Sequence, residues 1–528
     1  MQPAMNLGRL LSDTARLYPA REALVQGTQS WTWRELDDRV NAAVQALRDV
    51  PLSKGDRLLL LSANCPQMFE MMWATFKAGL VLVPCNFRLT PPEIAYISEN
   101  SGARAVVYGP GFQEHVDAAK QNSSPPEHII SFADPRANEM GYDALLAANH
   151  GAPRREESVA YNDLAWLFYT SGTTGRSKGA MLSHGMMSFV ANNMLADLMP
   201  GLTVNDASLV VAPLSHGAGA HVPPNVARGA KTVLLSSAKF DAEEVWRLVE
   251  EHRISNMFTV PTIVKMMVEH PAVDHYDHSS LRHVVYAGAP MYREDQKRAL
   301  AKLGPVLVQY YGMGEIPGTI TYLPTYMHTA DDSDPMARSG TCGIARTGME
   351  VAIRGEDGGV LDADEQGEIC VRGPAVLTGY YENAEANTKS FKDGWFHTGD
   401  LGKVDTEGFV YLTGRASDMY ISGGTNVYPR ETEEALLTHP AVSEVAIVGV
   451  PDPKWGESGV AVIVAEPGTH ASAEELAAFL DGKVARYKHP RMFFFWDEIP
   501  KSAYGKVPKR LVRTQLYERG DLAEGETL

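Results

Sequence analysis

The sequence predicts an α/β protein. We expect a large N-terminal domain of doubly wound α/β subdomains plus a β-barrel-like subdomain, followed by a small C-terminal α+β domain. The chain has 528 residues, more than one hydrophobic core usually supports. Apolar strands and amphipathic helices alternate from about residue 56 to residue 309, which is typical of parallel sheets covered by helices. From about Gly340 the strands become short and are separated by Gly, Asp and Pro turns, which indicates antiparallel pairing.

The first 160 residues begin the α/β pattern. Residues 1–50 read as helix with a short strand pair, and an amphipathic helix starts at Trp31-Thr-Trp-Arg-Glu-Leu and runs through Leu47. The next predicted elements are, in order, strand Arg57–Ser62, helix Pro66–Lys77, and strands Gly79–Pro84 and Ala103–Tyr108. The Met-rich face of the helix is interpreted as core, because methionine fills irregular gaps. Residues 110–160 are polar with weak periodicity and are predicted to be a surface connection.

The alternation then resumes around a glycine-rich loop. An apolar strand, Leu164–Phe168, leads into that loop. The predicted elements after it are helices Gly185–Leu198 and Ala242–His252, and strands Ser208–Ala212, Lys231–Leu235, Asn256–Val260, His283–Tyr286 and Val306–Gln309.

The sequence pattern changes twice in the last third of the chain. Short strands at Glu350–Arg354, Gly367–Arg372 and Gly408–Thr413 predict the β-barrel-like subdomain. A polar junction, Arg415–Gly424, precedes a smaller α/β unit, so we place the domains at residues 1–414 and 415–528. That unit is predicted to contain helices Pro429–His439 and Ala473–Val484 and strands Val445–Val450, Val460–Val464 and Met492–Trp496.

Composition narrows the class of protein. The net charge of −17 argues against a general nucleic-acid partner, which favours a basic face. The four cysteines have no metal-type spacing and are interpreted as buried thiols in a reducing compartment. The N-terminus lacks an apolar signal core, and no stretch approaches the roughly 18 apolar residues of a membrane span. We therefore expect a cytoplasmic protein with no integral membrane segment.

The most informative stretch is Tyr169–Gly179, with the sequence Tyr-Thr-Ser-Gly-Thr-Thr-Gly-Arg-Ser-Lys-Gly. Glycines let the backbone approach a ligand closely, and successive N–H groups in such a turn can bind an anion. Hydroxyl and cationic side chains add donors suited to a polyphosphate. The usual P-loop has Gly-Lys-Ser/Thr in direct sequence, whereas Arg176 and Ser177 separate Gly175 from Lys178 here. Composition alone fits a plain surface turn equally well.

Further stretches rich in glycine, aromatic and charged residues follow in order. They are Pro213-Leu-Ser-His-Gly-Ala-Gly, Tyr286-Ala-Gly-Ala-Pro-Met, Gln309-Tyr-Tyr-Gly-Met-Gly-Glu, Gly394-Trp-Phe-His-Thr-Gly-Asp, Gly414-Arg-Ala-Ser-Asp-Met-Tyr-Ile-Ser-Gly-Gly-Thr-Asn-Val-Tyr-Pro-Arg-Glu and Pro500-Lys-Ser-Ala-Tyr-Gly-Lys-Val-Pro-Lys-Arg. Together with the loop they resemble the signature of the adenylate-forming (AMP-binding) superfamily, in its order and over essentially the full length. Within that superfamily the chain resembles the branch of acyl-CoA synthetases that act on fatty or aryl acids.

The resemblance implies an ATP-dependent acid–CoA ligase that forms an acyl-AMP and then a thioester. ATP and CoA are co-substrates, Mg²⁺ is the cofactor, and the small C-terminal domain is mobile. The implied ATP-binding residues are Thr170, Ser171, Gly172, Thr173, Thr174, Gly175, Lys178, Gly288, Ala289, Pro290, Tyr311, Gly312, Asp400 and Arg415. Glu315 would bind the metal, since a hard cation prefers carboxylate and phosphate oxygens. Asp400 would accept hydrogen bonds from the ribose hydroxyls.

The resemblance also assigns the remaining site residues. Lys506 would be the catalytic lysine, with His216 and Glu315 as the other catalytic groups. The acid would lie against His216, Gly217, Val260, Gly288 and Met313. Gly423 and Gly424 would line the CoA passage, and Ser417 would be the hinge.

Two positions depart from the family pattern. Relatives usually carry Thr directly before the metal-binding Glu, where this chain has Gly314; a water or Thr319 is the substitute considered. Relatives carry Asp or Lys at the hinge, where this chain has Ser417 followed by Asp418, so either residue can be the hinge.

Several questions stay open at this point. Gly217 replaces the Asp that amino-acid-activating relatives use, which argues against an amino acid as the acid. A medium- or long-chain fatty acid and an aryl acid both fit. Alternatives are a ligase that loads a carrier-protein phosphopantetheine, a luciferase-like oxidase and a non-catalytic ATP-binding protein. A homodimer is a further option.

Overall fold

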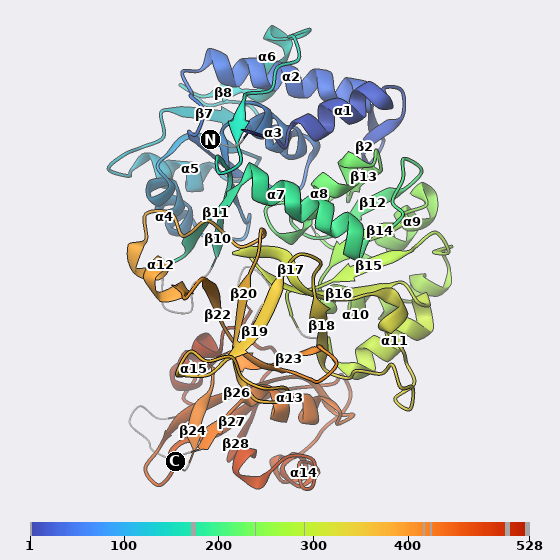
Figure 1. Ribbon diagram of the computed structural model, residues 1–528, viewed down its shortest axis with the longest axis vertical. Coiled ribbons are helices and arrows are strands. Elements are labelled where there is room, and N and C mark those ends of the chain that lie inside the picture. The colour runs from blue at the N-terminus through green and yellow to red at the C-terminus, as the bar shows by residue number, and fades with distance from the viewer. Residues whose placement is uncertain are drawn as a thin grey trace.

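The computed structural model of the protein describes residues 3–170, 176–237, 239–289, 291–415, 418–422, 425–501 and 507–522. Its strands form two large sheets, a smaller C-terminal sheet and a two-stranded ribbon of β1 (Pro3–Ala4) and β9 (Val159–Ala160). The helices lie around and between the large sheets, and the C-terminal part occupies one end of the molecule (Figure 1). The predicted fold class, an α/β protein with a large N-terminal part and a small C-terminal part, is confirmed.

The first large sheet has seven strands in the order β11-β10-β5-β4-β6-β7-β8. Every pairing in it is parallel except that of β10 with β11, which is antiparallel. Its strands are β4 (Arg57–Leu61), β5 (Val81–Cys85), β6 (Ala103–Tyr108), β7 (His128–Ser131), β8 (Met140–Gly141), β10 (Leu164–Thr170) and β11 (Lys178–Ser183).

The second large sheet joins the predicted α/β and β-rich regions in one path, β19-β20-β22-β23-β18-β17-β16-β15-β14-β12-β13-β2-β3. Pairing is parallel from β2 to β16 and antiparallel from β16 to β19, so β16 is where the sheet changes type. Its strands are β2 (Glu22–Gln26), β3 (Gln29–Thr32), β12 (Ala207–Val210), β13 (Lys231–Leu234), β14 (Asn256–Thr259), β15 (His283–Tyr286), β16 (Leu307–Met313), β17 (Ile316–Leu323), β18 (Thr341–Ala345), β19 (Glu350–Arg354), β20 (Gly367–Arg372), β21 (Phe391–Lys392), β22 (Trp395–Val404) and β23 (Val410–Arg415).

Three apolar clusters cover both faces of the first sheet and of the parallel half of the second sheet. The largest joins inward residues of the two sheets through the helices between them, and the other two lie on the outer faces. The Met-rich face predicted in α3 is core, with Met68, Met71 and Met72 buried. The helices are α1 (Arg9–Leu17), α2 (Trp33–Asp49), α3 (Pro66–Lys77), α4 (Pro91–Ser101), α5 (Gln113–Lys120), α6 (Tyr142–Ala148), α7 (His184–Asn193), α8 (Gly217–Ala227), α9 (Ala242–His252), α10 (Pro261–Glu269), α11 (Arg293–Leu303) and α12 (Ala384–Ser390).

Residues 110–160 correct the prediction of a surface connection. They contain α5, α6 and the strands β7 and β8, and β7 pairs in parallel with β6 along four residues, Ala105–Tyr108. Ile130 and Tyr142 are almost completely buried, so this segment belongs to the core. Its apolar residues come in runs too short to show a clear period, and only the neighbouring sheet makes them strands.

The C-terminal part forms its own mixed sheet. β26 and β27 form a long antiparallel hairpin, and the other edge of β27 pairs with β24 near Gly456 and with the parallel strand β28 farther along. Two small apolar clusters belong to this part alone. Its elements are β24 (Tyr420–Ser422), β25 (Thr425–Val427), α13 (Pro429–Leu437), β26 (Val442–Asp452), β27 (Gly456–Ala465), α14 (Ala473–Phe479), β28 (Met492–Phe495) and α15 (Lys509–Glu518).

Cys85, Cys342 and Cys370 are buried free thiols as predicted, whereas Cys65 is only half-buried. Every helix in the described part of the chain is too short or too polar to cross a membrane.

A buried ion pair yields the first prediction. Arg346 Nε lies 3.0 Å from Asp197 Oδ2, and both side chains are at most 5% exposed. Arg346 also donates to the Gly318 carbonyl, at the cavity described below. Asp197→Ala leaves the guanidinium buried without a counter-charge, so we expect a loss of about 3–5 kcal/mol in the free energy of unfolding.

Denaturant titration of the purified chain measures this loss. The matched control is Asp274→Ala, which removes an exposed ion pair to Lys302 and should cost at most about 1 kcal/mol. Equal losses in the two variants would contradict the role assigned to the buried pair.

Candidate active site

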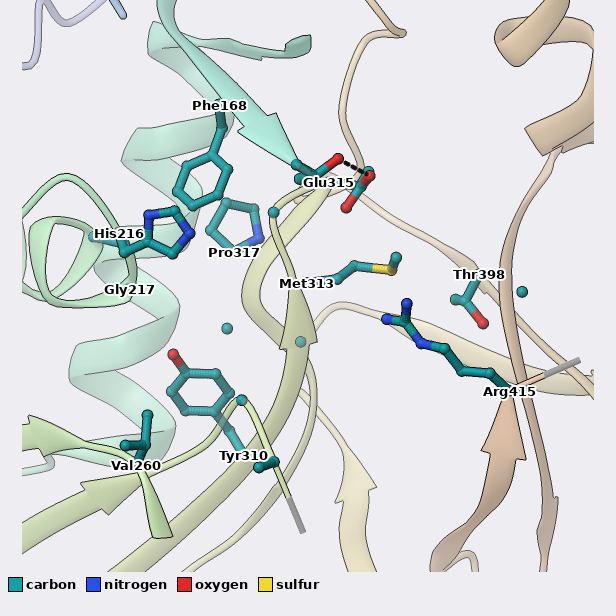
Figure 2. Close-up of a pocket in the computed structure, with 18 of the residues that line it drawn as sticks. Phe168, His216, Gly217, Val260, Tyr310, Met313, Glu315, Pro317, Thr398 and Arg415 are labelled. Carbon is teal, nitrogen blue, oxygen red and sulfur yellow. Dashed lines mark hydrogen bonds between the residues drawn. The ribbon is translucent and has the colours of Figure 1, made fainter. Parts of the chain in front are cut away.

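A cavity of about 1180 Å³ lies where the two large sheets approach each other and the C-terminal part begins. The end of β10, the first turn of α8, the β16–β17 turn and the strands β20, β22 and β23 contribute its walls. Figure 2 shows His216 and Phe168 on one side, Arg415 and Thr398 on the opposite side, and Met313 between them. Most predicted site residues that the structure describes line this one cavity.

The glycine-rich loop connects β10 to β11. The two strands pair in antiparallel register with Thr170 opposite Lys178, so both ends of the loop lie side by side. Thr170 and Lys178 line the cavity. The predicted loop residues Ser171, Gly172, Thr173, Thr174 and Gly175 lie outside the described residues.

Glu315 is a buried carboxylate at the turn between β16 and β17. The hydroxyls of Thr170 and Tyr380 each donate to its Oε1 at 3.0 Å. The side chain is held beside the end of the loop and still lines the cavity (Figure 2). Burial and the Glu315 charge raise the pKa of Tyr380, which keeps that phenol protonated as a donor. Tyr380 was not predicted, because its part of the sequence matched no motif.

Asp400 is held between an aromatic residue and a cation. Tyr311 donates to Asp400 Oδ2 at 2.6 Å, and Arg415 Nε lies 3.1 Å from Oδ1. The antiparallel register of β22 and β23 creates this pair by placing Asp400 directly opposite Arg415. Burial and Asp400 raise the pKa of Tyr311 far above its usual value. Arg415 lines the cavity, whereas Tyr311 and Asp400 lie just behind the wall.

The predicted acid-binding residues form the opposite part of the cavity. His216, Gly217, Val260, Gly288 and Met313 all line it, together with the predicted ATP-binding Ala289 and Gly312. His216 precedes α8 directly, and its ring lies 4.9 Å from that of Phe168. The segment after His216 forms the helix α8, which packs between the sheets through buried residues such as Val222 and Val226.

Three aromatic residues of this wall were not predicted: Phe168, Phe258 and Tyr310. Phe258, Tyr310 and the buried His221 lie nearly parallel, with ring centroids 4.7–5.9 Å apart. Burial lowers the pKa of His221 to about 3, so this ring is neutral and packs as an apolar group. Tyr310 stands next to the predicted Tyr311, but only the alternation of side chains along β16 reveals that it faces the acid side.

Gly314 has a steric explanation in this structure. A Cβ atom at this position would lie 2.4 Å from Thr170 Cγ2 and 2.6 Å from the Phe168 ring. The space that a threonine would occupy is therefore filled by two other side chains. Thr319 cannot replace the missing hydroxyl, since its side chain is fully buried and does not line the cavity.

The remaining predicted residues, Pro290, Ser417, Gly423, Gly424 and Lys506, lie outside the described residues. Their roles stay predictions.

The fold and the site define an adenylate-forming enzyme. The family model of the AMP-binding enzyme matches residues 11–381, and that of the AMP-binding enzyme C-terminal domain matches residues 431–506. The first match covers more than half of the chain, so the chain belongs to the AMP-binding enzyme family. The predicted superfamily is confirmed.

Relatives extend this match to nearly the full length. Feruloyl-CoA synthase from Amycolatopsis sp is 36% identical over 502 residues, which cover 94% of this chain and 96% of that protein. The long-chain-fatty-acid–CoA ligase FadD13 from Mycobacterium tuberculosis is 32% identical over 515 residues, with coverage of 97% and 98%. The structure of o-succinylbenzoate CoA synthetase (MenE) from Bacillus subtilis, in complex with the acyl-adenylate OSB-AMP, is similar with a TM-score of 0.83. Its identity is 30%, and the coverage is 98% of this chain and 99% of that chain.

The contact at Gly314 yields the second prediction. Gly314→Ala should lower the rate of acid-dependent adenylation by on the order of 10-fold or more, because its Cβ must displace Thr170 or Phe168 from the cavity wall. Pyrophosphate exchange into ATP measures this step.

A second variant makes the explanation specific. Thr170→Ser keeps the hydroxyl that donates a hydrogen bond to Glu315 but removes the methyl group that lies nearest to the new Cβ. The double variant with Gly314→Ala and Thr170→Ser should recover part of the lost rate. A double variant no faster than Gly314→Ala would show that the contact with Thr170 is not the cause.

Proposed function

We propose that this chain is an ATP-dependent acid–CoA ligase, an AMP-forming acyl-CoA synthetase. It activates a carboxylic acid as acyl-AMP with release of pyrophosphate, and then transfers the acyl group to CoA. One observation carries the proposal: the phosphate-loop end, the Glu315 carboxylate and the apolar acid side share a single cavity. The named activities of the relatives, a feruloyl-CoA synthase, a fatty-acid–CoA ligase and an o-succinylbenzoate CoA synthetase, support the same class.

In the first step the acid's carboxylate oxygen attacks the α-phosphorus of ATP and pyrophosphate leaves. Thr170, Lys178 and the loop between them would bind the β- and γ-phosphates at the ends of β10 and β11. Asp400 would accept hydrogen bonds from the ribose hydroxyls, and Tyr311 and Arg415 would fix the orientation of its carboxylate. Positioned donors and charges of this kind supply most of the catalysis in phosphoryl-type transfers.

The residues around Glu315 fit a magnesium ion. Its carboxylate is buried, lines the cavity beside the loop, and accepts its two described hydrogen bonds on Oε1. Mg²⁺ is typically bound by one or two carboxylates together with substrate phosphates. Glu315 would be the protein ligand, and the ion would neutralise charge on the phosphates. Thr170 and Tyr380 would hold Glu315 in place.

The acid would lie between His216 and Gly288, with its distal part against Val260, Phe258 and Tyr310. A Cβ atom on Gly217 would lie 2.6 Å from the Phe258 ring, so the Asp used by amino-acid-activating relatives has no room here. The apolar and aromatic lining fits a fatty or an aryl acid. Among the described residues, this lining places no carboxylate beside Gly217 that could bind an ammonium group.

The second step would involve the C-terminal part, which we place at residues 415–528. Arg415 ends β23 at the cavity, so the proposed hinge at Ser417 follows the nucleotide site directly. Lys506 would act in adenylation, and Gly423–Gly424 would admit the thiol arm of CoA after the C-terminal part rotates. Rotation of a domain between two steps is a known way to use one site twice.

A panel of acids tests the proposal. The purified chain is incubated with ATP, Mg²⁺, CoA and each of a series of aliphatic, aryl and amino acids, and AMP and thioester are measured by mass. Equal amounts of AMP and thioester are expected for an aliphatic or aryl acid. AMP production with transfer only to phosphopantetheine on a carrier protein would favour the carrier ligase. AMP with oxygen consumption would favour an oxidase, and no AMP with any acid would contradict an enzyme of this class.

Lys506 yields the third prediction. Lys506→Ala should lower adenylation by a factor on the order of 10² or more, because a cation that stabilises charge in the transition state is lost. Thioester formation from a preformed acyl-adenylate should stay close to the parent rate.

The matched control is Lys501→Ala in the same basic stretch, where Lys501 pairs with Glu444 at 2.8 Å on the surface. This variant should keep both steps. If Lys506→Ala slowed the two steps equally, the assignment to adenylation would be wrong.

A further inference from the structure

Three side chains with metal-binding atoms meet on two adjacent strands. Glu368 and Cys370 are two residues apart on β20, so they share one face of the strand. Cys370 is the register partner of His397 on β22 in this antiparallel pair, which brings the two side chains together. The three ligand atoms lie within 4.8 Å of one another. The predicted role of the Gly394–Asp400 motif, ribose binding by Asp400, uses none of them.

The distances fit a small tetrahedral site. Cys370 Sγ lies 3.4 Å from His397 Nδ1, and Glu368 Oε2 lies 2.7 Å from the same nitrogen. Zinc–sulfur and zinc–nitrogen bonds of about 2.3 and 2.0 Å place neighbouring ligand atoms roughly 3.3–3.6 Å apart. The sulfur and nitrogen already have this spacing. The half-exposed carboxylate must move away from the nitrogen by at least about 0.5 Å to reach this spacing, a shift within the rotamer freedom of such a side chain.

Surrounding groups complete the site. Glu368 Oε1 accepts a hydrogen bond from the Gly399 backbone N–H at 2.9 Å, the kind of outer contact that orients a ligating carboxylate. Glu368 and His397 line the main cavity, which gives an ion a path of entry and a fourth position open to solvent. A thiolate and a carboxylate bring two negative charges, which offset a divalent ion beside the cavity-lining Arg354 and Lys392.

We propose that Glu368, Cys370 and His397 form a binding site for a divalent transition metal of the zinc type. Sulfur and imidazole ligands select such an ion over Mg²⁺, which prefers oxygen alone. The site lies on β20 and β22, whereas Glu315 lies at the turn between β16 and β17. Its ligand Glu368 also holds Gly399, the residue before Asp400, so a bound ion alters the support of that carboxylate. A bound ion therefore weakens use of ATP, an effect that rests on the proposed function.

Metal binding is tested first, without reference to activity. The full-length chain is treated with a chelator and titrated with Co²⁺, whose thiolate charge-transfer absorption reports a Cys ligand. One ion per chain is expected, displaced by Zn²⁺ and not by Mg²⁺. Cys370→Ser should abolish the absorption and weaken binding at least 10-fold. Cys342→Ser, at a buried thiol on β18 outside the cluster, should bind as the parent does.

The results separate a metal site from a simple hydrogen-bonded pair. His397→Gln changes a partly exposed position and leaves the buried thiol in place, and it should lose Co²⁺ binding as well, so a folding defect in Cys370→Ser does not decide the outcome. No thiolate absorption in the parent, or the same absorption in Cys370→Ser, overturns the site.

The effect on ATP is measured separately. Zn²⁺ should raise the KM for ATP in the parent chain and in Cys342→Ser, and leave it unchanged in Cys370→Ser. Equal inhibition of parent and Cys370→Ser would place the inhibitory ion elsewhere and overturn the coupling to Asp400. A chain without ligase activity would leave the Co²⁺ result intact and overturn only the proposed function.

Discussion

The change of strand direction at β16 is the constraint on which the site depends. β16 pairs in parallel with β15 and antiparallel with β17, so it belongs to both halves of the second sheet. The tight turn that follows it carries Gly314 and Glu315 to the wall of the cavity. In open α/β sheets ligands bind at the carboxyl ends of parallel strands. Here the antiparallel continuation adds β22 and β23 to that edge, and with them Asp400 and Arg415.

Buried polar groups around the cavity support one another. A carboxylate removed from water is costly unless hydrogen bonds or opposite charges compensate. Glu315 receives two hydroxyl donors, and Asp400 receives one phenol and one guanidinium. Thr170 comes from the first sheet, so Glu315 acquires its position only when both sheets are assembled, whereas Tyr311 and Arg415 hold Asp400 within the second sheet. The site is thereby coupled to the completeness of the fold.

The sequence predicted the strands and helices with strong apolar periodicity, including β4, α3, α9 and β20. It also predicted most cavity-lining motif residues, because glycine, charge and aromatic residues cluster there in a specific order. It failed for residues 110–160, whose short apolar runs become strands only beside β6. Tyr380, Phe168 and Phe258 could not be predicted as site residues, since their roles arise from tertiary contacts to Glu315, Gly314 and Gly217. The steric reason for a glycine at position 314 could likewise not be predicted, because the side chains that a Cβ would meet there belong to β10.

The close contact between Gly217 and Phe258 has a consequence for engineering this chain toward other acids. Any side chain added at Gly217 meets a ring that packs against both His221 and Tyr310, which restricts how the ring can move aside. Residues in direct contact change free energies in a non-additive way. A mutant library that varies one of these positions at a time will therefore return mostly inactive clones. A library that varies Gly217 and Phe258 together, with a smaller residue at position 258 whenever a larger one stands at position 217, reaches combinations that single substitutions cannot.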